Sequence, residues 1–193
     1  LRGAGNLLGG EQSGHIEAIG FELYTSMLER TIREMKGEQA PDEVETQLNL
    51  GLNIRIPGDY IGEENQRLRM YKRVAGVERE AQLHDVRAEL IDRYGEPPRA
   101  VRNLLEYAEL KLVAVRVGVN SIERKREQVS IKFRQTAIVD PERLARFVAS
   151  QRGTQFTPDG ALKFVQKATA PEEVLSYLKT LLEELTGTPS AAA

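Results

Sequence analysis

Cysteine is absent from the chain, and only two histidines are present. Without cysteine the protein has neither a disulfide framework nor a cysteine-ligated metal. No acidic partner can be assigned to His15 or His84, so we expect no metal or acid–base role for either. No apolar run approaches the length of a membrane span, and no signal peptide is recognisable. These absences favour a cytoplasmic protein without a membrane partner.

Neither sign of charge dominates the chain. It has 27 basic and 29 acidic residues, which gives a net charge of -2. This balance argues against a protein whose whole surface coats nucleic acid. Residues 121–135 are locally basic, and we interpret them as a solvated loop, with nucleic-acid contact as the alternative. That alternative lacks the interleaved aromatic side chains that stack on bases.

Signatures of catalysis are also missing. No lysine follows the glycine run at residues 3–10, so the sequence has no G-x-x-x-x-G-K-[ST] loop to bind phosphates. No nucleophile–base pair, carboxylate dyad or metal cluster can be assigned. The chain also starts without an initiator methionine. We therefore expect a non-enzymatic fragment of a longer protein, with no cofactor of its own.

The first fifteen residues are rich in glycine. Residues 1–15 contain five glycines, and Arg2 and Gln12 stand among them. A long amphipathic pattern follows over residues 16–36. Because glycine lets the backbone turn tightly or approach another surface closely, we interpret this stretch as a rigid elbow that leads into a helix. It would present Arg2 and Gln12; a flexible chain terminus is the alternative.

Hydrophobic periodicity defines the rest of the chain, beyond a polar boundary at residues 38–45. Residues 47–56 alternate apolar and polar side chains, which predicts a strand with one buried face. The fold class predicted is α+β: an N-terminal glycine-rich elbow and long helix, then a helical cluster packed with a small antiparallel sheet. Helices are expected at about 64–75, 78–94, 98–118, 141–152 and 171–187, and short strands at 129–133, 155–157 and 161–166.

The first helix of the cluster is locally basic. Arg67, Arg69, Lys72 and Arg73 fall within two turns of it. Such side chains could contact phosphates, the carboxylates of another domain, or only solvent. The sequence alone leaves these three readings open.

Several stretches, in order along the chain, resemble the transcription-repair coupling factor family. Residues 2–9 and 11–14 are similar to the motif called "translocation in RecG", and residues 19–24 continue as in coupling factors. Residues 67–73, 89–95 and 162–164 resemble the C-terminal domain of that family. The resemblance implies that residues 1–40 are the end of a second motor lobe with the translocation motif. It implies that residues 45–190 are a C-terminal regulatory domain.

The resemblance also implies a function. The parent would be an ATP-dependent, double-stranded DNA translocase of helicase superfamily 2 that displaces stalled RNA polymerase and recruits UvrA in nucleotide excision repair. Its upstream motor lobes would bind ATP and magnesium, and Arg2 and Gln12 would couple hydrolysis to movement. The C-terminal domain would pack on the N-terminal domain and mask the UvrA site, with Arg67, Arg69, Lys72 and Arg73 as the clamp surface. A stand-alone nucleic-acid-binding module and a purely structural cap of the motor are the alternatives.

Overall fold

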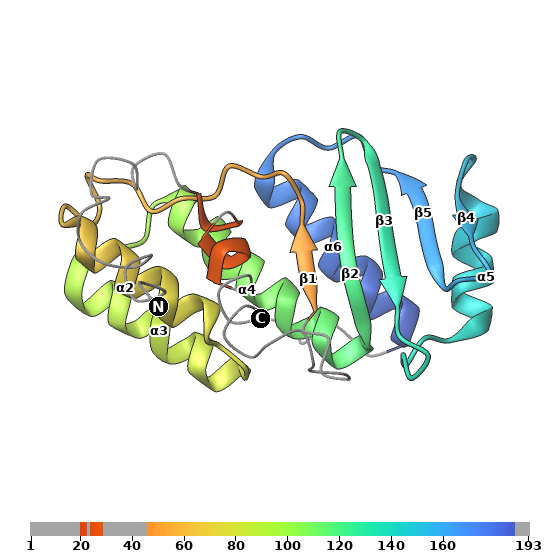
Figure 1. Cartoon of the computed structure of the whole chain (residues 1–193), viewed down its shortest axis with the longest axis horizontal. Helices are drawn as coiled ribbons and strands as arrows, with labels where there is room; N and C mark the ends of the chain where they lie inside the picture. The colour runs from red at the N-terminus through yellow and green to blue at the C-terminus, as the bar shows by residue number, and fades with distance from the viewer. Residues whose placement is uncertain (1–19, 23, 29–45, 188–193) are drawn as a thin grey trace, which may run out of the picture.

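The computed structural model describes residues 20–22, 24–28 and 46–187. In this part of the chain, one end of the molecule is helical and the other is built around a sheet (Figure 1). The predicted α+β class is confirmed. The helices are α2 (Glu64–Ala75), α3 (Glu80–Tyr94), α4 (Arg99–Val117), α5 (Pro141–Ser150) and α6 (Pro171–Thr186); the strands are β1 (Gln47–Asn49), β2 (Val119–Lys125), β3 (Gln128–Phe133), β4 (Gln155–Phe156) and β5 (Ala161–Val165).

The five strands form one mixed sheet in the order β1-β2-β3-β5-β4. β1 pairs in parallel with β2, and the other neighbours are antiparallel. The prediction of a purely antiparallel sheet is therefore wrong at this one edge. A parallel pair needs a long crossover, and α2, α3 and α4 supply it here. Helix α6 lies behind the sheet in the view of Figure 1, and α5 lies at the β4 edge.

Capping residues fix the ends of two helices where the sequence predicts them. The Asp140 carboxylate accepts hydrogen bonds from the backbone N–H groups of Glu142 and Arg143, at 2.8 and 3.2 Å, at the start of α5. Helix α4 ends at Gly118, which has a φ of +85°. A Cβ there would lie 2.7 Å from the Cα of Ala137. Glycine therefore lets β2 begin directly after α4, beneath the loop that carries Ala137.

The interpretation of the basic run in residues 121–135 as a solvated loop is wrong, whereas the strand expected at 129–133 is confirmed as part of β3. Most of this segment forms the β2–β3 hairpin, and Ile122 is fully buried within it. Arg124 is only partly exposed, so the basic run is not a free loop. A bulge between Val119 and Ser121 interrupts the register with β3. Because the bulge breaks the alternation of apolar and polar residues, β2 lacks the pattern that identifies a strand in a sequence.

Residues 50–56 keep the predicted alternation of burial but do not form a ladder beyond β1. Side chains bind part of the backbone of residues 47–56 instead. The N–H of Ile56 donates to the Tyr71 hydroxyl at 2.7 Å, and the Tyr107 hydroxyl donates to the carbonyl of Leu48 at 2.7 Å. The strand prediction is thus right about the buried face, but only Gln47–Asn49 pair as a strand. The buried side chains are Leu50, Leu52, Ile54 and Ile56.

Phe21, Tyr24 and Leu28, from the helical residues 21, 22 and 24–28, pack into the same hydrophobic core. The Phe21 ring is 2% exposed and lies 5.5 Å from the Tyr107 ring, edge to face. The rings of Phe21 and Tyr24 lie 5.7 and 5.8 Å from that of Tyr71. Figure 1 shows this segment between α2 and β1. The expected domain boundary at residues 38–45 lies outside the described residues. No helix in the described part of the chain has the length and apolar character to span a membrane.

Candidate functional site

The predicted site residues divide into two groups. Arg2 and Gln12, predicted to couple hydrolysis to movement, lie outside the described residues. The four basic residues predicted for a clamp surface all lie on α2. They do not share one environment, however, because Arg67 is buried and the other three are exposed.

Arg67 fastens the preceding loop to α2. Its side chain is 6% exposed. Its Nη1 atom donates to the carbonyl oxygens of Ile61 and Gly62 at 2.7 and 3.0 Å. These bonds satisfy the buried carbonyl of Ile61 and the partly buried carbonyl of Gly62. The geometry therefore gives Arg67 a structural role and separates it from the accessible basic surface.

Arg69, Lys72 and Arg73 line an open groove between α2 and α3. The groove has a volume of about 550 Å³. Helix α3 supplies the facing wall with Glu89 and Arg93. We call this feature the α2–α3 groove. Its charged lining consists of four basic residues, Arg69, Lys72, Arg73 and Arg93, and the acidic Glu89.

A carboxylate organises one side of the α2–α3 groove. Glu89 accepts from Arg73 Nε at 2.9 Å and from Arg93 Nη1 at 2.8 Å. The hydrogen bond that Arg93 donates to Glu89 raises the pKa of Arg93. The Arg93 guanidinium also lies 5.0 Å from the centre of the Tyr94 ring. Two arginine side chains are thus held in defined positions on the rim.

The other side of the groove carries charges without partners. Among the described residues, neither Arg69 nor Lys72 takes part in an ion pair or a side-chain hydrogen bond. Both are exposed to solvent. Such charges lose little by staying in water and are available to a carboxylate on another surface. The α2–α3 groove therefore offers two free cations beside two arginines that are already ordered.

Sequence reasoning missed the α3 wall of the groove. Glu89 and Arg93 lie on a different helix from the basic cluster, and no periodicity shows that α2 and α3 face each other at this point. A signal existed, since residues 89–95 are one of the stretches that resemble coupling factors. His84, also on α3, is exposed and does not line the groove.

A second groove, between α4 and α6, is acidic and less suited to bind a partner. Its lining includes Glu106 and Glu109, and its volume is about 450 Å³. Lys179 pairs with Glu109 at 3.1 Å. Burial raises the pKa of Glu106, although the nearby Lys179 opposes that shift. Cations of the described chain already pair with two of its four glutamates, Glu109 and Glu172, so the α2–α3 groove is the stronger candidate site.

The family model and the similar proteins all indicate the same family. Residues 50–144, which include α2, α3 and α4, match the family described as the TRCF domain. The chain is 42% identical to the transcription-repair-coupling factor of Staphylococcus haemolyticus over 135 residues, covering 69% of this chain and 12% of that protein. It is 38% identical to that of Haemophilus influenzae over 169 residues, covering 85% and 15%. It is 33% identical to that of Escherichia coli over 192 residues, covering 96% and 17%.

The fold agrees with this family. A crystal structure of the C-terminal domain of transcription-repair coupling factor superposes with a TM-score of 0.63 at 23% identity, covering 75% of this chain and 93% of that chain. The chain spans only 12–17% of the length of the three full-length relatives above. By its sequence and the fold of its TRCF domain, the chain belongs to the transcription-repair coupling factor family.

Proposed function

We propose that the chain is the regulatory C-terminal domain, with the preceding translocation motif, of an ATP-driven double-stranded DNA translocase that couples transcription to DNA repair. Family membership and the names of the relatives support this assignment. The ATP and magnesium sites belong to motor lobes elsewhere in the parent protein, which displaces stalled RNA polymerase and recruits UvrA. In this proposal Arg2 and Gln12 couple ATP hydrolysis to movement on DNA.

The α2–α3 groove is the regulatory surface in this proposal. The observation that carries it is the presence of two unpaired, exposed cations, Arg69 and Lys72, beside two arginines ordered by Glu89. A cluster that is already ordered loses less side-chain entropy when it binds a partner. The groove is therefore suited to a surface that carries carboxylates.

The proposed partner is the N-terminal domain of the same protein. A contact that has to be released favours charged groups over a large apolar area. Exposed ion pairs contribute about 0.2–1 kcal/mol each, so a few of them restrain a domain without locking it. While the contact holds, it masks the surface that UvrA binds, and the motor stays in a resting state.

Charge reversal in the groove tests this function. In the full-length parent, the double variant Arg69→Glu and Lys72→Glu removes two contacts of about 0.2–1 kcal/mol each and replaces them with repulsion. A loss of 1–2 kcal/mol shifts the closed-to-open ratio by roughly 5- to 30-fold. We expect the resting ATPase rate and the binding of UvrA both to rise. Steady-state ATP hydrolysis and equilibrium binding of UvrA measure the two effects.

A matched control separates the groove from net charge. Lys125→Glu with Lys163→Glu makes the same change in charge at exposed positions on β2 and β5. This control should leave both readouts at the resting level. If the groove variant also stays at that level, the regulatory role is wrong and the domain is a structural cap. Salt-dependent binding of the chain to DNA would support the remaining alternative, a nucleic-acid-binding module.

A further inference from the structure

The segment after the glycine-rich stretch is anchored to the TRCF domain by its backbone. The N–H of Phe21 donates to the carbonyl of Ile54 at 2.8 Å. A Cβ on Gly20 would lie 3.3 Å from that same oxygen, so glycine allows this close approach. Gly20 and Phe21 are therefore fixed on residues 50–56, which belong to the domain.

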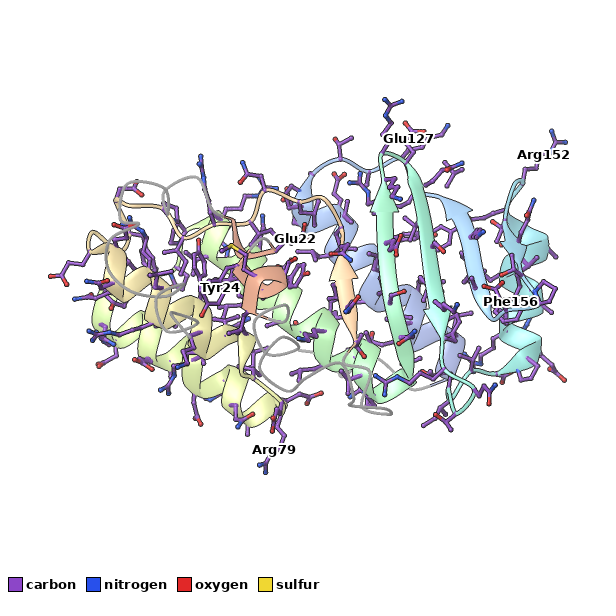
Figure 2. The ribbon with its side chains drawn as sticks, in the orientation of Figure 1. Glu22, Tyr24, Arg79, Glu127, Arg152 and Phe156 are labelled. Atoms are coloured by element: carbon purple, nitrogen blue, oxygen red, sulfur yellow. The ribbon has the colours of Figure 1, made fainter. Side chains whose placement is uncertain are left out.

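A carboxylate adds a second, directional attachment one residue later. The Oε1 atom of Glu22 accepts from the N–H of Leu50 at 3.0 Å, and Oε2 accepts from the N–H of Gly51 at 3.0 Å. Gly51 has a φ of +66°, and successive N–H groups in such a conformation form a concave anion-binding nest. Both carboxylate oxygens are thus bound by the backbone of the domain. Figure 2 shows Glu22 at the junction of the helical segment with the chain around β1.

Arg124 stabilises the rim of this nest. Its Nη1 atom donates to the carbonyl of Leu50 at 3.4 Å, and its Nη2 atom donates to that of Ala168 at 2.8 Å. Burial raises the pKa of Glu22, although the backbone hydrogen bonds and the nearby Arg124 guanidinium oppose that shift. The nest therefore connects three parts of the molecule: the N-terminal segment, residues 50–51 and the β2 strand.

Apolar packing alone would already hold this segment, since Phe21 and Tyr24 are buried in the core. Apolar contacts are not directional, whereas a carboxylate bound through both oxygens fixes an orientation. Burying a carboxylate also costs free energy unless it is hydrogen-bonded. The presence of Glu22 is thus explained by control of orientation rather than by stability.

We propose that Glu22 is a positioning residue that fixes the orientation of the helical segment, residues 21, 22 and 24–28, on the TRCF domain. This inference rests on the proposed function for its consequence in the motor, because it makes the domain the support against which the translocation motif acts. The attachment itself can be tested in the chain alone.

Hydrogen exchange of the 193-residue chain tests the attachment. In Glu22→Ala we expect the backbone amides of Leu50 and Gly51 to exchange at least about tenfold faster, since each loses a charge-assisted hydrogen bond. In Glu22→Gln, one acceptor oxygen remains, and we expect an intermediate rate. Ser26→Ala, an exposed change on the same segment, should have no effect. Unchanged exchange at both amides in Glu22→Ala would overturn the proposal.

The coupling of ATP hydrolysis to movement tests the consequence in the full-length parent. We expect Glu22→Ala to raise the ATP consumed per base pair travelled, and Glu22→Gln to restore it in part. Val174→Ala, a buried change on α6, lowers stability away from the segment and should leave this ratio unchanged. An unchanged ratio in Glu22→Ala would overturn the proposed role in the motor. This result can be told apart from that of the groove variant. The groove variant tests whether the domain restrains the resting motor, and not how ATP hydrolysis is coupled to movement.

Discussion

Replacing Phe21 with alanine is expected to lower the free energy of unfolding of the chain by about 3–5 kcal/mol. The ring is 2% exposed and packs against two tyrosine rings, those of Tyr71 and Tyr107. Its loss removes apolar burial, opens a cavity and breaks two aromatic contacts. Urea denaturation monitored by circular dichroism measures the change, which corresponds to a drop in melting temperature of roughly 10 °C.

A change on the exposed side of the same segment is the control for this prediction. Ser26→Ala removes only a solvated hydroxyl and should change the free energy of unfolding by less than about 0.5 kcal/mol. If Phe21→Ala cost no more than this control, the helical segment would not be part of the domain core in solution. The anchoring of the N-terminal segment would then have no support.

Arg67→Ala is expected to destabilise the chain by about 1.5–3 kcal/mol, although the residue belongs to a cluster that looks like surface charge in the sequence. The change removes two hydrogen bonds from a charged donor to the carbonyls of Ile61 and Gly62, and it leaves the buried one unsatisfied. It also removes the packing of the side-chain stem. Chemical denaturation of the variant measures the loss.

Arg69→Ala is the matched control, two residues along the same helix. Arg69 is exposed and has no partner among the described residues, so its removal should change stability by less than about 0.5 kcal/mol. Equal effects from the two variants would contradict the separation of Arg67 from the groove. In the full-length parent, by contrast, Arg69→Ala should raise the resting ATPase rate more than Arg67→Ala, since Arg69 and not Arg67 contributes to the proposed restraint.

Local signals predict much of this fold. Asp140 specifies the start of α5 because a side-chain cap acts on residues next to it in the chain. The alternation in residues 47–56 correctly identifies a buried face. It does not show that Tyr71 and Tyr107 replace a neighbouring strand, because those residues lie far along the chain. Ile91 falls on the apolar stripe of α3 but is 41% exposed, since no element of the described chain covers it.

The candidate site was less accessible to sequence reasoning. The basic residues of α2 are visible as a cluster, but their exposure is not, and Arg67 differs from Arg69 only through the loop that folds over it. Glu89 organises the groove from a second helix, and only the packing of α2 against α3 brings it to Arg73. Glu22 reads as an ordinary polar position on a helix. Its contact with the backbone of Leu50 and Gly51 depends entirely on the tertiary fold.

Site-specific photo-crosslinking in the full-length parent is the most direct test of the central claim, that the α2–α3 groove contacts another domain of the same protein. A photoreactive amino acid is placed at position 72 in the groove, or at position 163 on β5 as the control, and crosslinked peptides are mapped by mass spectrometry. We predict an intramolecular crosslink from position 72 to the N-terminal domain in the resting protein, its loss in the Arg69→Glu variant, and none from position 163. If position 72 forms no such crosslink, or if both positions form it equally, the groove is not the restraining contact.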